Sequence, residues 1–196
     1  MNLRTAHESD IEPLSRLLAR AFHQDPFHCW LFPCSKTRLE KHQKFFFLTL
    51  RPRIRRGAVF TSDCQRVVAA WTSPEHELSL FHFLSSGLPC LSLMGSRAPL
   101  AVLAFFKTVA RQPKHPHFYL SLLAVDPPFQ GQGLGSGLLQ KLLSQSDQKN
   151  VPVYLEATSE RSFSFYQRHG FQLSETIQFP YRGPTLWLMN REPNRA

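Results

Sequence analysis

Hydrophobic residues recur along the chain at spacings that predict both helices and strands. Residues 2–6 are typical of a short first strand. Ser9 and Glu12 then form a capping-box pattern. The apolar residues that follow at helical spacing are Ile11, Leu14, Leu17, Leu18, Ala21 and Phe22. A helix with one apolar face is therefore expected directly after the first strand.

Proline residues divide the next part of the chain. Residues 25–27 and 32–33 are expected to bracket a loop, and residues 36–50 to form a helix with a basic outer face. The basic run 51–56 should close this helix, because Pro52 disfavours helical backbone at the residue before it. Residues 58–61 and 67–71 are rich in β-branched and aromatic side chains and flank a polar turn, which predicts a β-hairpin.

Residues 78–112 predict a helical insert. Its first part, residues 78–96, carries no formal charge and imitates a membrane span, but Gly87, Pro89, Gly95 and several serines interrupt it. A bilayer helix needs about 20 predominantly apolar residues. We therefore expect paired amphipathic helices packed on a core, and no membrane partner.

The second half of the chain alternates strands and helices. Residues 117–125 form a near-continuous apolar run, typical of a strand buried on both faces. Leucines at 134, 138, 139, 142 and 143 predict a helix, and residues 151–157 a strand, which together make a βαβ unit. Residues 161–169 should form a short helix that ends at Gly170, and residues 171–178 and 185–189 two last strands. Residues 191–196 are expected to be solvated.

Composition limits the class of protein. The chain has 196 residues, of which 42% are hydrophobic and 19% charged, which is ordinary for a folded domain. We expect one α/β (α+β) domain over residues 1–191 and a polar tail over 192–196. The N-terminus reaches acidic residues before any apolar run, so a cytoplasmic location is expected. The four cysteines, too few and too irregularly spaced for a disulfide scaffold, should be reduced thiols.

The net charge suggests an anionic partner without identifying it. Lys and Arg number 23 against 14 Asp and Glu, a formal charge of +9. Nucleic acid, an anionic membrane and an anionic small ligand all fit this surplus. Composition alone therefore does not distinguish these partners, and the sequence motifs are needed to do so.

The most informative motif is a glycine-rich turn between the apolar strand and the leucine-rich helix. It carries Gly131, Gly133, Gly135 and Gly137. The first amides of a helix have no intrahelical acceptor and the helix dipole adds positive charge, so this turn is suited to bind phosphate. A Walker A loop would need a lysine that is absent, and neither frame of the dinucleotide pattern GxGxxG fits.

The turn does match the pattern Q/R-x-x-G-x-G/A, through Gln130, Gly133 and Gly135. A second motif, FYxxxGF, spans residues 165–171. With both motifs at this separation, the chain resembles the GNAT superfamily of acetyl-CoA-dependent N-acetyltransferases. The resemblance implies a mixed, mostly antiparallel sheet flanked by helices. It also implies transfer of the acetyl group of acetyl-CoA to a primary amine, which we expect to belong to a small molecule.

The resemblance also implies a donor site. Backbone amides from Gln130 to Ser136 would hold the diphosphate, and the main chain of residues 123–125 would pair with the pantetheine arm. The residues assigned to the donor are Leu123, Ala124, Val125, Gln130, Gly131, Gln132, Gly133, Leu134, Gly135, Ser136, Ser162 and Tyr166. Ser162 stands where many relatives have asparagine, and a hydroxyl can still donate one hydrogen bond.

Catalytic roles follow in the same way. Tyr166 matches the tyrosine that protonates the departing thiolate in many family members. Tyr119 and Ser121 stand where several relatives place a carboxylate or histidine, so the base is open. Glu156 is the nearest acidic candidate, with a structural role as an equal alternative; His117 and a chain of waters are others.

The acceptor side is expected between residues 28–35 and 179–184, with Trp30, Phe32, Tyr119, Ser121 and Tyr181 as substrate-binding candidates. We expect no metal, because His115 and His117 lack further ligands nearby. A monomer or homodimer is expected. Two alternatives stay open: a catalytically silent acyl-CoA-binding protein of the same fold, and a basic nucleic-acid-binding module led by the arginines of 51–56.

Overall fold

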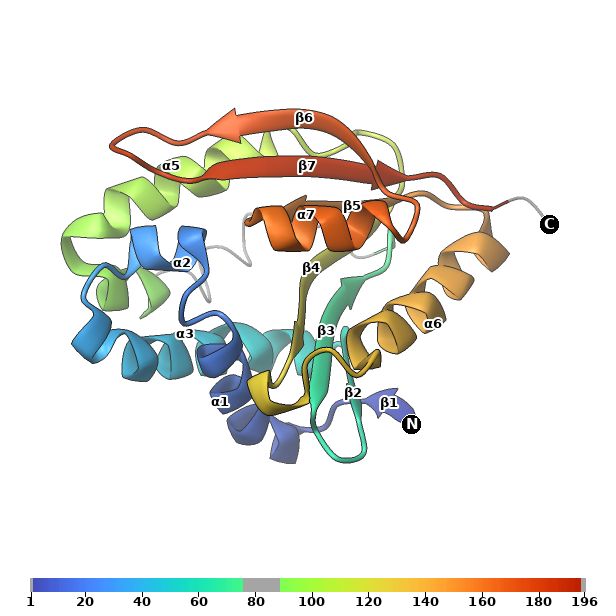
Figure 1. The fold of residues 1–196 in the computed structure, drawn as a ribbon, viewed down its shortest axis with the longest axis horizontal. Helices are drawn as coiled ribbons and strands as arrows, with labels where there is room; N and C mark the ends of the chain where they lie inside the picture. The colour runs from blue at the N-terminus through green and yellow to red at the C-terminus, as the bar shows by residue number, and fades with distance from the viewer. Residues whose placement is uncertain (1, 76–88, 195–196) are drawn as a thin grey trace.

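The computed structural model describes residues 2–75 and 89–194, which form a seven-stranded sheet with helices on both faces (Figure 1). The strand order is β1-β2-β3-β4-β5-β7-β6. Neighbouring strands are antiparallel except β4 and β5, which are parallel. The strands are β1 (Leu3–Thr5), β2 (Val59–Ser62), β3 (Val67–Thr72), β4 (Phe118–Val125), β5 (Val153–Ala157), β6 (Gln172–Gln178) and β7 (Thr185–Arg191).

The helices that cover the sheet are α1 (Ile11–Ala21), α2 (Pro26–Leu31), α3 (Ser35–Arg55), α5 (Ala98–Val109), α6 (Leu134–Lys149) and α7 (Glu160–Gln167). Because α6 connects the parallel strands β4 and β5, the predicted βαβ unit is confirmed. The predicted hairpin is confirmed as β2 and β3. The mixed, mostly antiparallel sheet is thus the one that the motifs implied.

Alternate residues of the strands pack against helices on the two faces. Val67, Ala69 and Leu155 face α6 and α7. Val68 and Ala70 face α1 and α3 on the opposite side. A third cluster joins α2 and α5 to the inner residues of β5, β6 and β7.

Strand β4 contains a β-bulge at Ser121. On β3, Ala70 pairs with Leu122 and Trp71 with Leu120, so Ser121 is an extra residue without a partner in β3. Strand β4 pairs with β5 only from Phe118 to Leu120. Beyond the bulge the two strands diverge (Figure 1). The prediction of a strand buried on both faces is therefore wrong for this half, where most residues are only half-buried.

Residues 26–31, predicted as part of a loop, form the short helix α2. Asp25 caps it, accepting hydrogen bonds from the amides of Phe27 and His28 at 3.0 and 3.1 Å. Pro26 at the first helical position suits this start, because its missing N–H would be unpaired there anyway. An Asp-Pro pair was a helix start signal that the sequence analysis interpreted as a turn.

Two helix boundaries also differ from the predictions. Helix α3 continues through Pro52 to Arg55, and Ile54 in this last turn packs in the core. The apolar contact outweighs the backbone hydrogen bond that proline removes. The capping box of Ser9 and Glu12 is absent; instead a 3-10 turn, Glu8–Asp10, precedes α1, and Asp10 accepts a hydrogen bond from the His7 amide at 2.7 Å.

Part of the predicted insert, residues 78–88, lies outside the described residues. From residue 89 the chain is helical, and Pro89–Val109 is long and apolar enough to cross a membrane by length and composition. Gly95, with a φ of 56°, opens a 3-10 turn inside this stretch. The stretch therefore consists of two helical segments, of which α5 is the second.

The C-terminal end of β7 is anchored to α6. Arg191, which was expected to be solvated, is only 5% exposed and forms an ion pair with Asp147 at 2.8 Å. The amide of Asn194 also donates to Asp147 at 2.8 Å. The four cysteines are free thiols, as expected.

A histidine-rich cluster lies between α1, α2 and α3. The rings of His28 and His42 are 5.0 Å apart, and Phe22, Phe32 and Phe46 pack around them. Burial lowers the pKa of His28 and of His42 to about 3. Both imidazoles are therefore neutral in the folded protein over the ordinary pH range.

We predict that this cluster makes the fold sensitive to mild acid. In the unfolded chain these histidines bind protons below about pH 6.5, whereas the folded protein excludes them until about pH 3. Stability is therefore lost as pH falls between these values, by about 1.4 kcal/mol per pH unit for each histidine. Between pH 7 and 5.5 the urea-derived free energy of unfolding should fall by roughly 2.5 kcal/mol from this pair.

The variant His42→Leu isolates the share of one histidine, because it removes one titrating group and keeps an apolar side chain. Its free energy of unfolding should depend about half as steeply on pH over this range. A slope equal to that of the wild type would show that His42 does not cause the sensitivity.

Candidate active site

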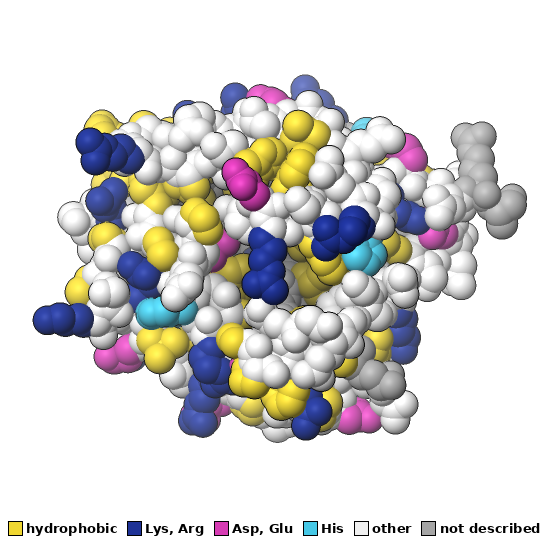
Figure 2. Space-filling view, in the orientation of Figure 1, with side chains coloured by type: hydrophobic (Ala, Val, Ile, Leu, Met, Phe, Trp, Pro, Cys, Tyr) yellow, Lys and Arg dark blue, Asp and Glu magenta, His cyan; other side chains and the backbone are white. Residues whose placement is uncertain are grey.

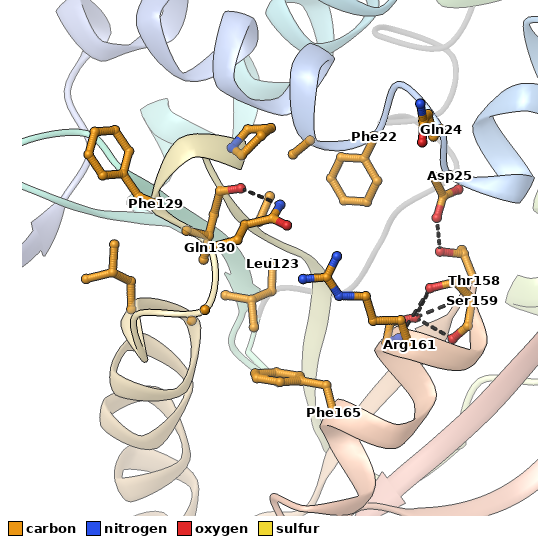
Figure 3. Close-up of a pocket in the computed structure, with 18 of the residues that line it drawn as sticks. Phe22, Gln24, Asp25, Leu123, Phe129, Gln130, Thr158, Ser159, Arg161 and Phe165 are labelled. Carbon is orange, nitrogen blue, oxygen red and sulfur yellow. Dashed lines mark hydrogen bonds between the residues drawn. The ribbon is translucent and has the colours of Figure 1, made fainter.

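A cavity of about 1030 Å³ opens where β4 and β5 diverge. Its wall comes from the second half of β4, the turn before α6, the end of α1 and the start of α7 (Figure 3). Figure 2 shows this face hollowed near its centre, with basic side chains beside the hollow. The bulge in β4 creates the opening, because it ends the pairing that would otherwise close the two strands.

Two glycines shape the turn before α6. Gly131 and Gly133 both have a φ of 78°, in the left-handed region that L side chains rarely adopt. A Cβ at either position would meet no heavy atom within 4 Å. Glycine is thus needed for the backbone conformation, and the space beside the turn stays open for a ligand.

The start of α6 offers unpaired amides to that space. Gly133 is the N-cap residue, and the first helical hydrogen bond runs from the Gly137 amide to the Gly133 carbonyl at 2.9 Å. The amides of residues 134–136 therefore have no acceptor within the helix. Together with the helix dipole they suit a phosphate group.

Side chains from distant parts of the chain hold this turn. Arg20 of α1 donates two hydrogen bonds to Asp126, at 3.0 and 2.9 Å. The guanidinium of Arg66 stacks 4.0 Å from the centre of the Phe129 ring. Gln130 donates through its side-chain amide to the Val125 carbonyl at 3.1 Å. The sequence analysis singled out Gln130 only by resemblance and missed the other anchors.

The structure places most of the predicted donor residues on the cavity wall. These are Leu123, Ala124, Val125, Gln130, Gly131, Gly133, Leu134, Gly135, Ser136, Ser162 and Tyr166. Gln132 is the exception; its side chain is exposed and it is not part of the wall.

Helix α7 begins with a reciprocal cap. The Ser159 hydroxyl accepts from the Ser162 amide at 3.2 Å, and the Ser162 hydroxyl accepts from the Ser159 amide at 3.1 Å. The Ser162 hydroxyl also donates to the Ser159 carbonyl at 2.8 Å. Because a hydroxyl has one proton to donate, Ser162 has none left for a ligand in this geometry.

Tyr166 lies one turn further along α7. It is 8% exposed, and its ring packs against Phe165 and Phe171. Burial raises the pKa of its phenol above the ordinary value. The hydroxyl therefore keeps its proton at neutral pH, as a proton donor must.

Glu156 lies on β5 but outside the cavity wall. The Tyr119 hydroxyl donates to Glu156 Oε2 at 2.7 Å. Burial raises the pKa of this carboxyl, and the Tyr119 hydrogen bond lowers it. Among the described residues, its buried Oε1 atom has no hydrogen-bond partner. Thr158, two residues further along the chain, is part of the wall.

The predicted acceptor residues also lie outside the wall of this cavity. Trp30 is buried and stacks on Phe179 at a centroid distance of 5.2 Å, and Phe32 is buried against His42. Tyr181 is 77% exposed in the turn between β6 and β7. Ser121 is the bulge residue, and Tyr119 is the partner of Glu156. Their role in acceptor binding stays a prediction.

The sequence analysis missed a contact on the cavity wall between Asp25 and Thr158. The Thr158 hydroxyl donates to Asp25 Oδ2 at 2.5 Å (Figure 3). Burial raises the pKa of the Asp25 carboxyl. This bond joins the start of α2 to the residue before the α7 cap. The only local signal was the Asp-Pro pair that starts α2.

Among the residues that the structure describes, no group of three or more His, Cys, Asp or Glu side chains could hold a metal ion. The polar groups on the cavity wall are amides, hydroxyls, one phenol, guanidinium groups, the imidazole of His23 and the carboxyl of Asp25. Such a wall can bind an anionic ligand and supply a proton.

Known proteins are similar to this chain over most of their length. The uncharacterized N-acetyltransferase C550.08 of Schizosaccharomyces pombe is 24% identical, over 98% of this chain and 84% of that protein. A Corynebacterium glutamicum structure, described as histone acetyltransferase HPA2 and related acetyltransferase, matches with TM-score 0.67 and 22% identity, covering 100% of this chain and 97% of that chain. A polyamine N-acetyltransferase of Drosophila melanogaster that forms N-acetylagmatine matches with TM-score 0.61 and 17% identity, covering 97% and 99%.

The family model for the acetyltransferase (GNAT) family matches residues 60–171, which contain β4, the glycine turn, α6, β5 and α7. This span is more than half of the chain and holds most of the cavity wall. The chain therefore belongs to the GNAT family of acetyltransferases and is an N-acetyltransferase of that fold.

Proposed function

We propose that the protein transfers the acetyl group of acetyl-CoA to the primary amine of a small molecule by direct attack on the thioester. The observation that carries this proposal is the left-handed glycine turn at the start of α6, beside the unpaired edge of β4. The turn supplies amides for a diphosphate, and the strand edge supplies main-chain groups for an extended, amide-containing arm. Both features fit coenzyme A.

Tyr166 would act as the proton donor. A phenol is a weaker acid than a thiol, with reference pKa values near 10 and 8.5. It gives up its proton to a poorly solvated thiolate as that charge develops. The buried ring of Tyr166 at the cavity wall supports this role.

Glu156 would accept the proton of the amine, directly or through water. Its raised pKa brings the carboxyl closer to neutral pH, where a general base works best. The Tyr119 hydrogen bond orients one oxygen and leaves the other free. A purely structural role for this pair is the competing interpretation.

Nucleic-acid binding is less well supported than amine acetylation. In the basic run of 51–56, Arg53 is half-buried and donates to the Thr49 carbonyl, and Arg55 is paired with Glu8. Two of the four arginines are therefore engaged within the protein, which leaves only Arg51 and Arg56 as exposed side chains without a hydrogen bond or ion pair among the described residues. A catalytically silent acyl-CoA-binding protein would have the same donor site, so a functional test is needed to distinguish it from an enzyme.

Calorimetric titration with acetyl-CoA tests the donor site. We expect micromolar binding by the wild type and roughly tenfold weaker binding by Gly133→Ala, because a left-handed non-glycine residue costs about 1–2 kcal/mol. Gly57→Ala is the matched control, since Gly57 has a φ of 68° but lies outside the cavity wall. It should lower stability without changing affinity.

The same protein is then mixed with acetyl-CoA and a panel of primary amines, and thiol release is measured. Release with at least one amine supports the enzyme. Binding without release on any amine supports the silent alternative, and absence of binding contradicts both.

The variant Tyr166→Phe tests the proton donor. Turnover should fall by about 10²-fold or more, the range for loss of a general acid. The affinity for acetyl-CoA should stay the same, because the phenyl ring keeps its packing against Phe171. Unchanged turnover would exclude Tyr166 from this role.

The pH profile of kcat/KM tests Glu156. A base works only when deprotonated, so activity should fall as pH drops through the pKa of Glu156. In Tyr119→Phe the hydrogen bond that lowers this pKa is gone, and the acidic limb should move to higher pH. In Glu156→Gln the limb should disappear along with most of the turnover. Profiles that stay unchanged in both variants would favour the structural role.

A further inference from the structure

The cavity contains a guanidinium that the donor chemistry does not use. Arg161 is the second residue of α7 and part of the cavity wall. In Figure 3 its side chain extends into the cavity, and its guanidinium lies between Gln130 on one side and Asp25 on the other. Within residues 2–75 and 89–194 it has no side-chain hydrogen bond or ion pair.

The other charged residues of the cavity wall are Arg20, Arg168 and Asp25. Arg20 is already paired with Asp126. Asp25, the carboxylate on the cavity wall, is already engaged within the protein: Oδ1 accepts from the amides of Phe27 and His28, and Oδ2 from Thr158. The guanidinium therefore stands in the cavity with its hydrogen-bond donors available.

The donor diphosphate has its own binding site. The amides of residues 134–136 lie at the start of α6, on the wall of the cavity across from the first turn of α7 (Figure 3). Arg161 instead comes from the same side as Thr158 and Asp25, where α7 meets α2. Arg161 therefore reaches into the cavity from the α2 side, and not from the side of the amides that we assign to the diphosphate.

We propose that Arg161 determines acceptor specificity by binding a carboxylate, so that the acceptor is an amino acid or another primary amine that carries a carboxylate. This inference rests on the proposed function. A guanidinium pairs with a carboxylate through two parallel hydrogen bonds, which fixes the orientation of the acceptor. It also repels a second cationic group on the acceptor, which disfavours polyamines that carry no carboxylate.

The proposal is tested with matched pairs of acceptors. Each pair consists of an amino acid and its decarboxylated amine: phenylalanine with phenethylamine, and lysine with cadaverine. We expect the wild type to acetylate at least one amino acid with a higher kcat/KM than its decarboxylated partner. In Arg161→Gln this preference should fall by about tenfold or more, the range for loss of a charge-assisted hydrogen bond.

Two further variants separate the guanidinium from its charge. Arg161→Lys keeps the charge without the planar fork and should retain only part of the preference. Arg16→Gln removes the same charge at an exposed position of α1 outside the cavity wall, and it should behave as the wild type. A loss of preference in Arg16→Gln would assign the effect to net charge and overturn the proposal.

Calorimetry with acetyl-CoA provides the readout for the donor. Arg161→Gln should bind acetyl-CoA as tightly as the wild type. Weaker acetyl-CoA binding with unchanged acceptor preference would assign Arg161 to the donor phosphates and overturn the proposal. So would a wild type that acetylates amines but no carboxylate-bearing one. A wild type that binds no acetyl-CoA, or acetylates no amine, would contradict the proposed function itself.

Discussion

The active site depends on the point where two parallel strands stop pairing. Strand β4 is hydrogen-bonded to β5 over only three residues, and the bulge at Ser121 redirects the chain beyond them. A continuous pairing would fill the space with main-chain hydrogen bonds and leave no room for a ligand. The interruption instead leaves a strand edge of residues 123–125 exposed to the cavity, with the glycine turn at its end. The proposed donor site is thus built from main-chain groups of β4 that do not pair with β5.

The remaining parts of the site are held by contacts between segments far apart in the chain. Arg20 and Asp126 are separated by 106 residues, and Asp25 and Thr158 by 133. The first contact fixes the glycine turn against α1, and the second fixes the start of α7 against α2. Since Tyr166 lies on α7, these two anchors set the distance between the proposed diphosphate site and the proposed proton donor. A change in either contact would therefore shift the glycine turn and Tyr166 relative to each other.

Features that depend on local sequence could be predicted, whereas features that depend on contacts between segments far apart in the chain could not. The glycine turn and the helix of Tyr166 could be identified because their motifs are short and each residue acts through local backbone or packing. The bulge at Ser121 could not, because it depends on the register with β3, which no pattern within residues 117–125 records. The length of α3 was underestimated because the packing of Ile54 overrides the local effect of Pro52. The Asp25 contact required knowledge of where β5 ends in space.

The ion pair between Arg191 and Asp147 has a mechanical consequence for the opposite end of α6. This helix begins at the glycine turn and ends next to Asp147, so it acts as a rigid rod of 16 residues with one end at the diphosphate site and the other at the last strand. A rod that is clamped at only one end can tilt. Shortening the chain before Arg191 would therefore loosen the orientation of the amides at the far end, at most about 20 Å from Asp147 for a helix of about 1.5 Å rise per residue. The C-terminal strand belongs to the donor site although it touches no part of it.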